Sequence, residues 1–323
     1  MQRRRRFLVL VLLVTMSVVG ACGTASTTSS GTPLERWMAA TPMYIAHRGG
    51  DGDWPEATGY AYTHATAWNP NLALEVPVWR TSDGVWVVSE DATTGRVFGV
   101  NLPIPGTRWA ILSTLRSSRG SYPMARLVND VLDVYGSNRI LFIDNKSDSN
   151  VTAFFDLLDS YGGRTRYVVK SYWQSTNTPV MARQRRYLTW GYYYAKDMPR
   201  FAKTQSKFDL LGLDYTASSA NFQVMRATGK PVIAHIINDP HAASVALNKG
   251  AQGLMVSAVE QVVPYQAGSG RQCPVAGTNA MPGGRGRTCT DHPSYPQVQD
   301  LVGTHRWSHR SEAAVRSSAW ARL

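Results

Sequence analysis

A histidine, an arginine and a glutamate near the start of the chain have the types and spacing of a phosphate-cleaving site. An apolar run ends in His47-Arg48, two glycines follow at Gly49 and Gly50, and a carboxylate follows at Glu56. Histidine exchanges a proton near neutral pH, and arginine binds phosphate through paired N–H groups. Glycine lets the backbone turn sharply and lie close to a ligand. The segment therefore predicts a loop that holds a proton carrier and an anion-binding group beside a phosphodiester.

Further carboxylates and a lysine accompany apolar runs later in the chain. Glu75 lies inside one run, Asp144 and Lys146 end another, and Glu90 follows a short apolar segment. Three carboxylates can bind a hard divalent cation such as Mg²⁺ or Ca²⁺, and cations stabilise the charge that develops on phosphorus. With His47 moving the proton, these residues predict metal-assisted cleavage of a phosphodiester, provided that the fold brings them together.

The apolar runs recur at the spacing of repeated strand–helix units, which predicts a parallel sheet. The eight expected strands are Met43–His47, Leu72–Val78, Ile140–Asn145, Tyr167–Ser171, Leu188–Tyr193, Leu210–Asp214, Val232–His235 and Gly253–Val256. Helix-length segments such as Thr58–Trp68 and Pro240–Lys249 separate them. This pattern indicates an α/β fold, a (β/α)8 TIM barrel, in which the carboxyl ends of the strands meet at one mouth. A doubly wound open sheet is the alternative, but no G-x-G-x-x-G turn follows a strand.

These motifs resemble, in order and spacing, those of the glycerophosphodiester phosphodiesterase family. The similar segments are Ile45–Gly49 with Pro55-Glu56, Leu74–Val78, the hairpin Thr81–Val88 with Glu90-Asp91, Phe142–Lys146, and Ile237–Pro240 with Gly250–Gly253. The resemblance extends from about Met43 to Val263 and implies a TIM barrel that cleaves phosphodiesters. The roles that it implies are general acid/base for His47, phosphate binding for Arg48, orientation of the pocket for Glu56, metal binding for Glu75 and Asp144, and phosphate neutralisation for Lys146.

Two residues depart from the family pattern. Pro77 stands at the position of a metal-binding Asp and has no side-chain donor, and Glu90 stands at the position of the second catalytic His. Glu90 could protonate a leaving group only if its surroundings raised its pKa. Alternatively, it could join Glu75 and Asp144 as a third oxygen ligand of the metal. The sequence leaves both roles open.

The sequence therefore predicts a hydrolase of glycerophosphodiesters, or of related lipid or wall-polymer head groups, with a small-molecule or lipid phosphodiester as substrate. The first alternative is a catalytically impaired protein that binds phosphate esters on the same barrel, because Pro77 and Glu90 alter the site. The second alternative is a lipid phosphodiesterase similar to the sphingomyelinase D relatives, which would retain a cyclic phosphate product. The sequence does not indicate an oligomeric state.

Residues 1–22 have the features of an export signal with a lipid-attachment site. Arg3–Arg6 form a basic segment, and Phe7–Val19 is apolar but too short to span a bilayer. The segment then ends in small residues and a cysteine, Cys22, which resembles the cleavage site of a bacterial lipoprotein. We therefore expect an exported protein that is anchored to the outer face of the cell membrane through lipidated Cys22, or secreted.

The rest of the chain divides into three expected parts. Residues 23–40 begin as a Gly/Ser/Thr-rich tract and are expected to form a flexible tether. The barrel is expected over residues 41–264. Residues 265–323 are rich in Gly, Pro and Arg and predict an irregular, poorly ordered tail. Cys273 and Cys289 in this tail could form a disulfide in an oxidising compartment.

The net charge of +12 does not indicate a nucleic-acid partner. Arg3–Arg6 contribute four positive charges, and seven Arg against three acidic residues from Tyr265 onward contribute a further four. The body of the chain is therefore only mildly basic, and no stripe of basic and aromatic residues runs along it.

Overall fold

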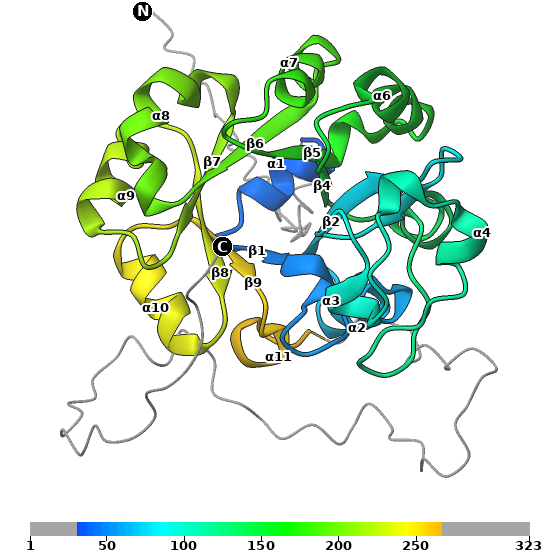
Figure 1. The fold of residues 1–323 in the computed structure, drawn as a ribbon. Coiled ribbons are helices and arrows are strands. Elements are labelled where there is room, and N and C mark those ends of the chain that lie inside the picture. The colour runs from blue at the N-terminus through cyan, green and yellow to red at the C-terminus, as the bar shows by residue number, and fades with distance from the viewer. Residues whose placement is uncertain (1–30, 267–323) are drawn as a thin grey trace, which may run out of the picture. The chain divides into compact units, whose positions relative to one another are not determined.

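The computed structural model describes residues 31–266, which form a closed barrel of eight parallel strands (Figure 1). The strands are β1 (Met43–Ala46), β2 (Ala73–Arg80), β4 (Leu141–Asn145), β5 (Tyr167–Tyr172), β6 (Leu188–Tyr193), β7 (Leu210–Asp214), β8 (Val232–Ile237) and β9 (Gly253–Val256). β1 closes the ring because it pairs in parallel with both β9 and β2. β3 (Trp86–Val88) pairs antiparallel with β2 as the expected hairpin. The predicted (β/α)8 TIM barrel is thus confirmed.

Helices connect successive strands on the outside of the barrel. The longer ones are α2 (Gly59–Trp68), α6 (Val151–Ser160), α7 (Asn177–Gln184), α8 (Met198–Thr204), α9 (Ser219–Arg226) and α10 (Pro240–Asn248), and the short ones are α3 (Gly95–Phe98), α4 (Trp109–Leu112), α5 (Asp133–Tyr135) and α11 (Val259–Val262). Side-chain caps start the predicted helices: Ala61 N–H donates to the Thr58 hydroxyl, and Ala242 N–H donates to Asp239 at 2.7 Å. Within residues 31–266 no helix combines the length and apolar character that crossing a bilayer requires.

The structure differs from the expected tether at residues 33–38, which form helix α1 (Pro33–Met38). Thr32 and Glu35 make a capping box at its start, and Leu34 and Trp37 are buried. The Trp37 ring packs edge-on against Phe142 of β4, with 5.5 Å between the ring centroids. This helix lies across the ring of strands in Figure 1 and belongs to the core inside the barrel. The prediction of a flexible tether is therefore wrong for these residues, because two large apolar side chains anchor them.

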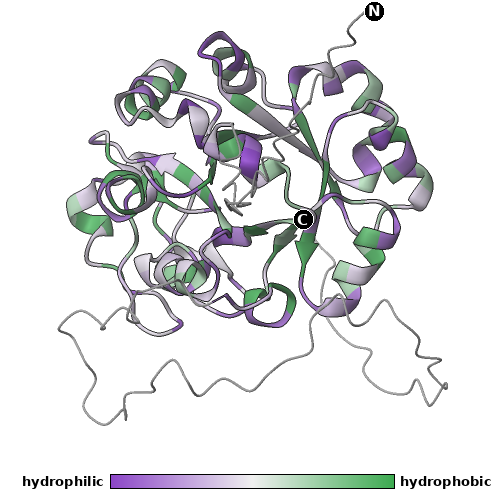
Figure 2. Ribbon diagram, turned by 180° about the vertical axis from the view of Figure 1, so that it is seen from behind, coloured by the Kyte–Doolittle hydropathy of each residue, from purple (hydrophilic) through white to green (hydrophobic). Residues whose placement is uncertain are grey.

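Apolar side chains fill two regions, one inside the barrel and one between the strands and the helices. The inner region takes side chains from alternate positions of the strands, such as Ile45, Phe142 and Val168. The outer region takes the opposite positions and the buried sides of the helices. In Figure 2 the helices accordingly carry hydrophilic and hydrophobic residues side by side. Close packing on both faces of each strand fixes the register that positions the residues at the strand ends.

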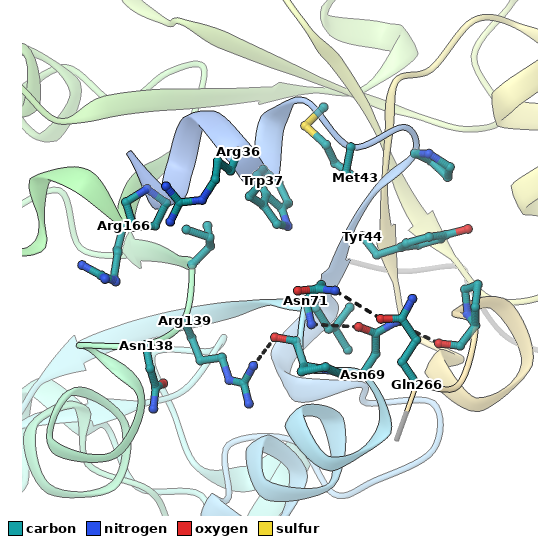
Figure 3. A pocket seen from close by; sticks show the side chains of 17 residues that line it. Arg36, Trp37, Met43, Tyr44, Asn69, Asn71, Asn138, Arg139, Arg166 and Gln266 are labelled. Atoms are coloured by element: carbon teal, nitrogen blue, oxygen red, sulfur yellow. Dashed lines mark hydrogen bonds between the residues drawn. The ribbon is translucent and has the colours of Figure 1, made fainter. Parts of the chain in front are cut away.

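A pocket of about 490 Å³ opens at the amino-terminal end of the barrel, beside α1 (Figure 3). Arg36, Arg139 and Arg166 are among its lining residues. None of the predicted catalytic, substrate-binding or metal-binding residues lines it. The candidate catalytic residues lie at the opposite, carboxyl-terminal end of the strands.

Several expected features lie outside the described residues. They are the export signal over residues 1–22 with Cys22, the first part of the expected tether, and the tail beyond residue 266 with Cys273 and Cys289.

Candidate active site

The loop after β1 places His47 at the carboxyl end of the barrel and gives it a carboxylate partner. Oδ1 of Asp51 lies 2.9 Å from Nδ1 of His47, and the Ser257 hydroxyl donates to the same oxygen. The turn that brings Asp51 back to His47 uses a backbone φ of 82° at Gly49 and 92° at Gly50, where glycine is favoured. Burial opposes ionisation of Asp51, but the hydrogen bonds from His47 and Ser257 outweigh it and lower the pKa of the carboxyl.

This pairing determines which nitrogen of His47 is available for proton transfer. An ionised carboxylate can only accept a hydrogen bond, so Asp51 assigns the ring proton to Nδ1. Nε2 is then the basic nitrogen, and it lies 3.8 Å from Oε2 of Glu75. In the neutral form of this tautomer, Nε2 of His47 carries no proton and can accept one, as a general base must.

Three acidic residues hold Arg48 in place. Its backbone N–H donates to Oε2 of Glu75 at 2.8 Å, and its Nη1 donates to Oε2 of Glu56 at 3.0 Å. Its Nη2 lies 3.7 Å from Oε1 of Glu90. The second oxygen of Glu56 accepts a hydrogen bond from Arg96 at 2.5 Å. Glu56 therefore ties two guanidinium groups together, in agreement with the orienting role that the resemblance implies.

A buried lysine on β5, Lys170, lies between two of the predicted metal ligands. Its Nζ is 2.7 Å from Oε1 of Glu75 and 2.7 Å from Oδ2 of Asp144. The same ammonium lies 4.5 Å from the centre of the Tyr192 ring, a cation–π distance. Burial opposes the charge on Lys170, but Asp144 and Glu75 more than compensate and raise its pKa well above the ordinary value. The two carboxylates thus hold an ammonium ion at neutral pH.

Glu90 follows the β3 hairpin and contacts a second lysine. Nζ of Lys146 lies 2.8 Å from Oε1 of Glu90 and 3.3 Å from Oδ2 of Asp144. Burial opposes ionisation of Glu90, but Lys170, Lys146 and Arg48 together hold its pKa well below the usual range for a glutamate. A carboxyl with a lowered pKa is ionised at neutral pH and cannot protonate a leaving group. The structure therefore argues against the general-acid role considered for Glu90.

Each carboxylate expected to bind a divalent cation has one oxygen in an ion pair with a lysine of the chain, whereas Oε2 of Glu90 is buried without a hydrogen-bond partner. A metal ion between Glu75 and Asp144 would have to take the position of the Lys170 ammonium. Glu90 is paired with Lys146, and Pro77 offers no ligand. In residues 31–266 no three His, Cys, Asp or Glu side chains are grouped as a metal site. The donor set does not fit the Mg²⁺ or Ca²⁺ that the resemblance implies.

Aromatic side chains from β6 border the lysines. The Tyr192 hydroxyl lies 3.5 Å from Nζ of Lys146, and Tyr194 is 40% exposed at the barrel end. Both rings pack nearly perpendicular to the ring of His235, a histidine on β8. Burial, with Lys170 nearby, lowers the pKa of His235 to about 3, and its Nε2 lies 3.1 Å from the Tyr193 carbonyl oxygen. His235 is therefore neutral at neutral pH.

The structure brings all the predicted site residues into one network of contacts. They are His47, Arg48, Glu56, Glu75, Glu90, Asp144 and Lys146. Their chemical roles stay predictions. The sequence analysis did not find Asp51, Arg96 and Lys170. A lysine inside the apolar run Tyr167–Tyr172 was the available signal for the last of these.

Comparison with known proteins gives a consistent answer. Residues 47–253 match the model of the glycerophosphoryl diester phosphodiesterase family. No curated protein matches the sequence significantly.

Solved structures share the fold at low sequence identity. A phosphodiesterase from Oleispira antarctica, in complex with the product sn-glycerol-3-phosphate, is 19% identical over 68% of this chain and 94% of its own, with a TM-score of 0.58. A glycerophosphodiester phosphodiesterase from Thermotoga maritima is 19% identical over 67% of this chain and 95% of its own, with a TM-score of 0.54. A glycerophosphodiester phosphodiesterase from Agrobacterium tumefaciens is 15% identical over 66% of this chain and 95% of its own, also with a TM-score of 0.54.

The family match covers more than half of the chain and includes the segments that carry His47, Arg48, Glu75 and Lys146. The barrel found here is also the fold of the solved relatives. The protein therefore belongs to the glycerophosphoryl diester phosphodiesterase family of phosphoric diester hydrolases.

Proposed function

We propose that this protein hydrolyses glycerophosphodiesters, with His47 as the proton-transferring residue. The observation that carries the proposal is the His47–Asp51 pair, which leaves Nε2 of His47 as the proton-accepting nitrogen at the end of the barrel. The other oxygen of Asp51 lies 3.9 Å from Nη1 of Arg48, so the same carboxylate contacts both residues. Lys146 supplies a second cation from the neighbouring strand end. The product bound by the Oleispira antarctica relative supports a small-molecule diester of glycerol phosphate as the substrate.

The chemistry follows from these positions. Nε2 of His47 takes a proton from water, or from a free hydroxyl of the substrate, as that oxygen forms a bond to phosphorus. The bond from phosphorus to the departing alcohol breaks, and the alcohol oxygen takes up a proton from solvent because Glu90 is ionised. Arg48 and Lys146 stabilise the charge on the phosphoryl oxygens. Attack by water gives a phosphomonoester directly, whereas attack by a substrate hydroxyl gives a cyclic phosphate that water then opens.

Turnover of a panel of glycerophosphodiesters and lysolipids by the wild type and by His47→Ala tests the proposal. We expect a loss of at least about 10³-fold in His47→Ala, since a general base contributes on this scale. His241→Ala, at an exposed position on α10, is the matched control and keeps full activity. Phosphorus NMR of the products separates hydrolysis from the sphingomyelinase D-like alternative, which accumulates a cyclic phosphate. Equal activity in His47→Ala and His241→Ala would refute the assignment.

Binding of phosphate esters without turnover is the second candidate, and one observation favours it. Glu90 stands at the position of a catalytic His and is ionised at neutral pH. It forms an ion pair with Lys146 at 2.8 Å, so this lysine is not free to contact a substrate phosphate. This candidate predicts that the folded protein binds sn-glycerol-3-phosphate, measured by calorimetry, yet releases no product from any substrate. The Glu90→His variant should then gain phosphodiesterase activity. If the wild type is active and Glu90→His loses that activity, Glu90 instead contributes to the wild-type reaction.

We also propose that the enzyme works outside the cytoplasm, anchored through lipid on Cys22. The support is the basic, apolar and small-residue succession in residues 1–22. Cys22→Ser should move the protein from the membrane fraction to the soluble exported fraction, and labelling with a radioactive fatty acid should disappear. A wild-type protein that takes up no label and stays in the soluble fraction would contradict lipid anchoring. The substrate would then be a phosphodiester of lipids or wall polymers at the cell surface.

A further inference from the structure

Lys170 occupies the position that a bound cation would take between two carboxylates. Glu75 and Asp144 are the residues to which the resemblance assigns metal binding, and each has an oxygen 2.7 Å from Nζ of Lys170. β5 pairs with β4 so that Lys170 lies directly opposite Asp144. The register of β4 and β5 therefore places the Lys170 ammonium between the two carboxylates.

The charges at this position are balanced for a lysine. The pattern that the resemblance implies places three carboxylates, at the positions of Glu75, Pro77 and Asp144, around a divalent cation, and these charges sum to −1. In this chain, Pro77 stands in place of an Asp, so one negative charge is missing. Lys170 carries a charge of +1, one less than a divalent ion. Glu75, Asp144 and Lys170 therefore also sum to −1. The loss of the ligand at Pro77 and the presence of Lys170 compensate each other.

Because these three charged groups are buried, the number of positive and negative charges among them matters for stability. Glu75 is 0% exposed, Asp144 3% and Lys170 5%. Charges at this depth need a partner of opposite sign, because water does not screen them. A divalent ion added beside Lys170 would place two cations between the same two oxygens, and such like-charge contact is unfavourable at low dielectric. The site therefore accommodates the lysine or the metal, not both.

We propose that Lys170 replaces the divalent cation of this family, so that the enzyme hydrolyses its substrate without a metal. The inference rests on the proposed hydrolysis of glycerophosphodiesters. Lys170 acts as a positioning residue through Glu75. One oxygen of Glu75 contacts Lys170, and the other accepts the Arg48 backbone N–H at 2.8 Å and lies 3.8 Å from Nε2 of His47. The ammonium thus fixes the carboxylate that aligns the phosphate-binding and proton-transferring residues.

Binding of Mn²⁺ to the full chain tests this inference independently of activity. Electron paramagnetic resonance counts bound Mn²⁺, and the melting temperature reports binding to the folded state. The variants are Lys170→Ala, the double variant Lys170→Ala/Pro77→Asp, and Lys203→Ala as a matched control at an exposed position on α8. Turnover is measured in parallel with EDTA and with added Mg²⁺ or Mn²⁺.

The wild type and Lys203→Ala should bind no Mn²⁺ at this site up to about 1 mM, the range of weak carboxylate sites, and EDTA should leave their turnover unchanged. Lys170→Ala should bind one Mn²⁺ per chain, with a rise in melting temperature on addition of the ion. The double variant should bind it at least about tenfold more tightly, because a third carboxylate is added. Turnover of both Lys170 variants should depend on added metal.

Two results would overturn the inference. One is a Mn²⁺ bound to the wild type that Glu75→Gln abolishes, and this result needs no Lys170 variant to fold. The other is a folded Lys170→Ala protein that binds no Mn²⁺. If no protein in the series turns over any substrate, the proposed function fails, while Mn²⁺ binding still decides the role of Lys170.

Discussion

At the scale of single residues, the site is a set of carboxylates that each hold a particular cation or imidazole. Asp51 holds His47, Glu56 holds Arg48, and Glu75 holds Lys170. Each pair is buried or half-buried, so its partners gain more from one another than an exposed pair would. The site therefore presents fixed charges to a substrate phosphate before the substrate arrives, which is the preorganisation that electrostatic catalysis requires.

Asp51→Asn tests the role of the carboxylate behind His47. We expect kcat to fall about 10²-fold or more, since the amide no longer stabilises the imidazolium and permits the wrong tautomer. KM should change little because Asp51 does not act on substrate in this account. Steady-state kinetics with matched circular dichroism checks this expectation. Unchanged kcat in a folded Asp51→Asn protein would remove Asp51 from the mechanism.

Glu90→Gln tests whether Glu90 competes with substrate for its cations. Removal of the charge leaves Lys146 and Arg48 with one carboxylate fewer, so sn-glycerol-3-phosphate should bind about tenfold more tightly, a gain of about 1.4 kcal/mol. Calorimetry measures the affinity, and Asp91→Asn is the control because that carboxylate contacts Arg96 at the rim. Weaker binding by Glu90→Gln would instead show that Glu90 positions Lys146 for the phosphate.

The sequence motifs predicted most of these residues, because a catalytic group at a strand end follows a recognisable apolar run. Asp51 was missed because its role depends on the turn through Gly49 and Gly50 rather than on a strand. Lys170 was missed because it lies inside a run, where a parallel strand normally carries apolar residues. Its partner across the sheet, Asp144, is 26 residues away in sequence, and only the strand register shows that they meet.

At the scale of elements, local signals predicted the strands to within a few residues, and helices such as α2 and α10. They did not predict α1, which is short. Helix α1 has only six residues and follows a Gly/Ser/Thr-rich tract, so its periodicity is too brief to stand out. What stabilises it is contact with the barrel interior through Leu34 and Trp37, and a pattern within one segment cannot show such contact.

Trp37→Ala tests the role of α1. We expect a loss of about 3 kcal/mol in the free energy of unfolding, since a buried tryptophan leaves a large cavity. Urea denaturation measures it, with the half-buried Trp109→Ala on α4 as a control that loses less. Turnover at low temperature should stay near wild type because α1 and the site are at opposite ends of the strands. A loss no larger than that of the control would show that α1 does not stabilise the barrel.

The loop after β1 also carries a pH-dependent contact with α11. Asp53 accepts the Glu260 N–H at 2.9 Å. Burial, and then the charge of Glu260, raise the pKa of Asp53 to about 6 against the backbone hydrogen bonds. A raised acid pKa means that the folded state binds the proton more tightly than the unfolded state. The stability from this group is therefore present below about pH 4 and is lost as the pH rises to about 6.

Asp53→Asn should remove this pH dependence while keeping an acceptor for the Glu260 N–H. Relative to wild type, the variant should gain on the order of 1 kcal/mol at pH 7.5, because solvent screening limits the effect of a partly exposed group. The gain should be much smaller at pH 4.5. Urea unfolding of both proteins at the two pH values measures the difference. An equal shift at both values would mean that Asp53 does not titrate in this range.

At the scale of the whole molecule, the closed barrel gathers at one mouth residues that are far apart in the sequence, such as Asp51 and Ser257, which are 206 positions apart. Arg48, Lys146 and Lys170 are balanced there by Glu75, Glu90 and Asp144. The family fold is kept, and on our proposal Lys170 supplies the positive charge that a divalent ion supplies in the family pattern. We propose that this arrangement cleaves a glycerophosphodiester with its own side chains.

The most direct test is the release of sn-glycerol-3-phosphate from glycerophosphodiesters by the wild-type protein after exhaustive dialysis against EDTA. We expect steady release at the same rate as before dialysis, with no increase when Mg²⁺ or Ca²⁺ is added. Release that stops on dialysis and returns with the metal would contradict the proposal, and so would a folded protein that binds the product but never forms it.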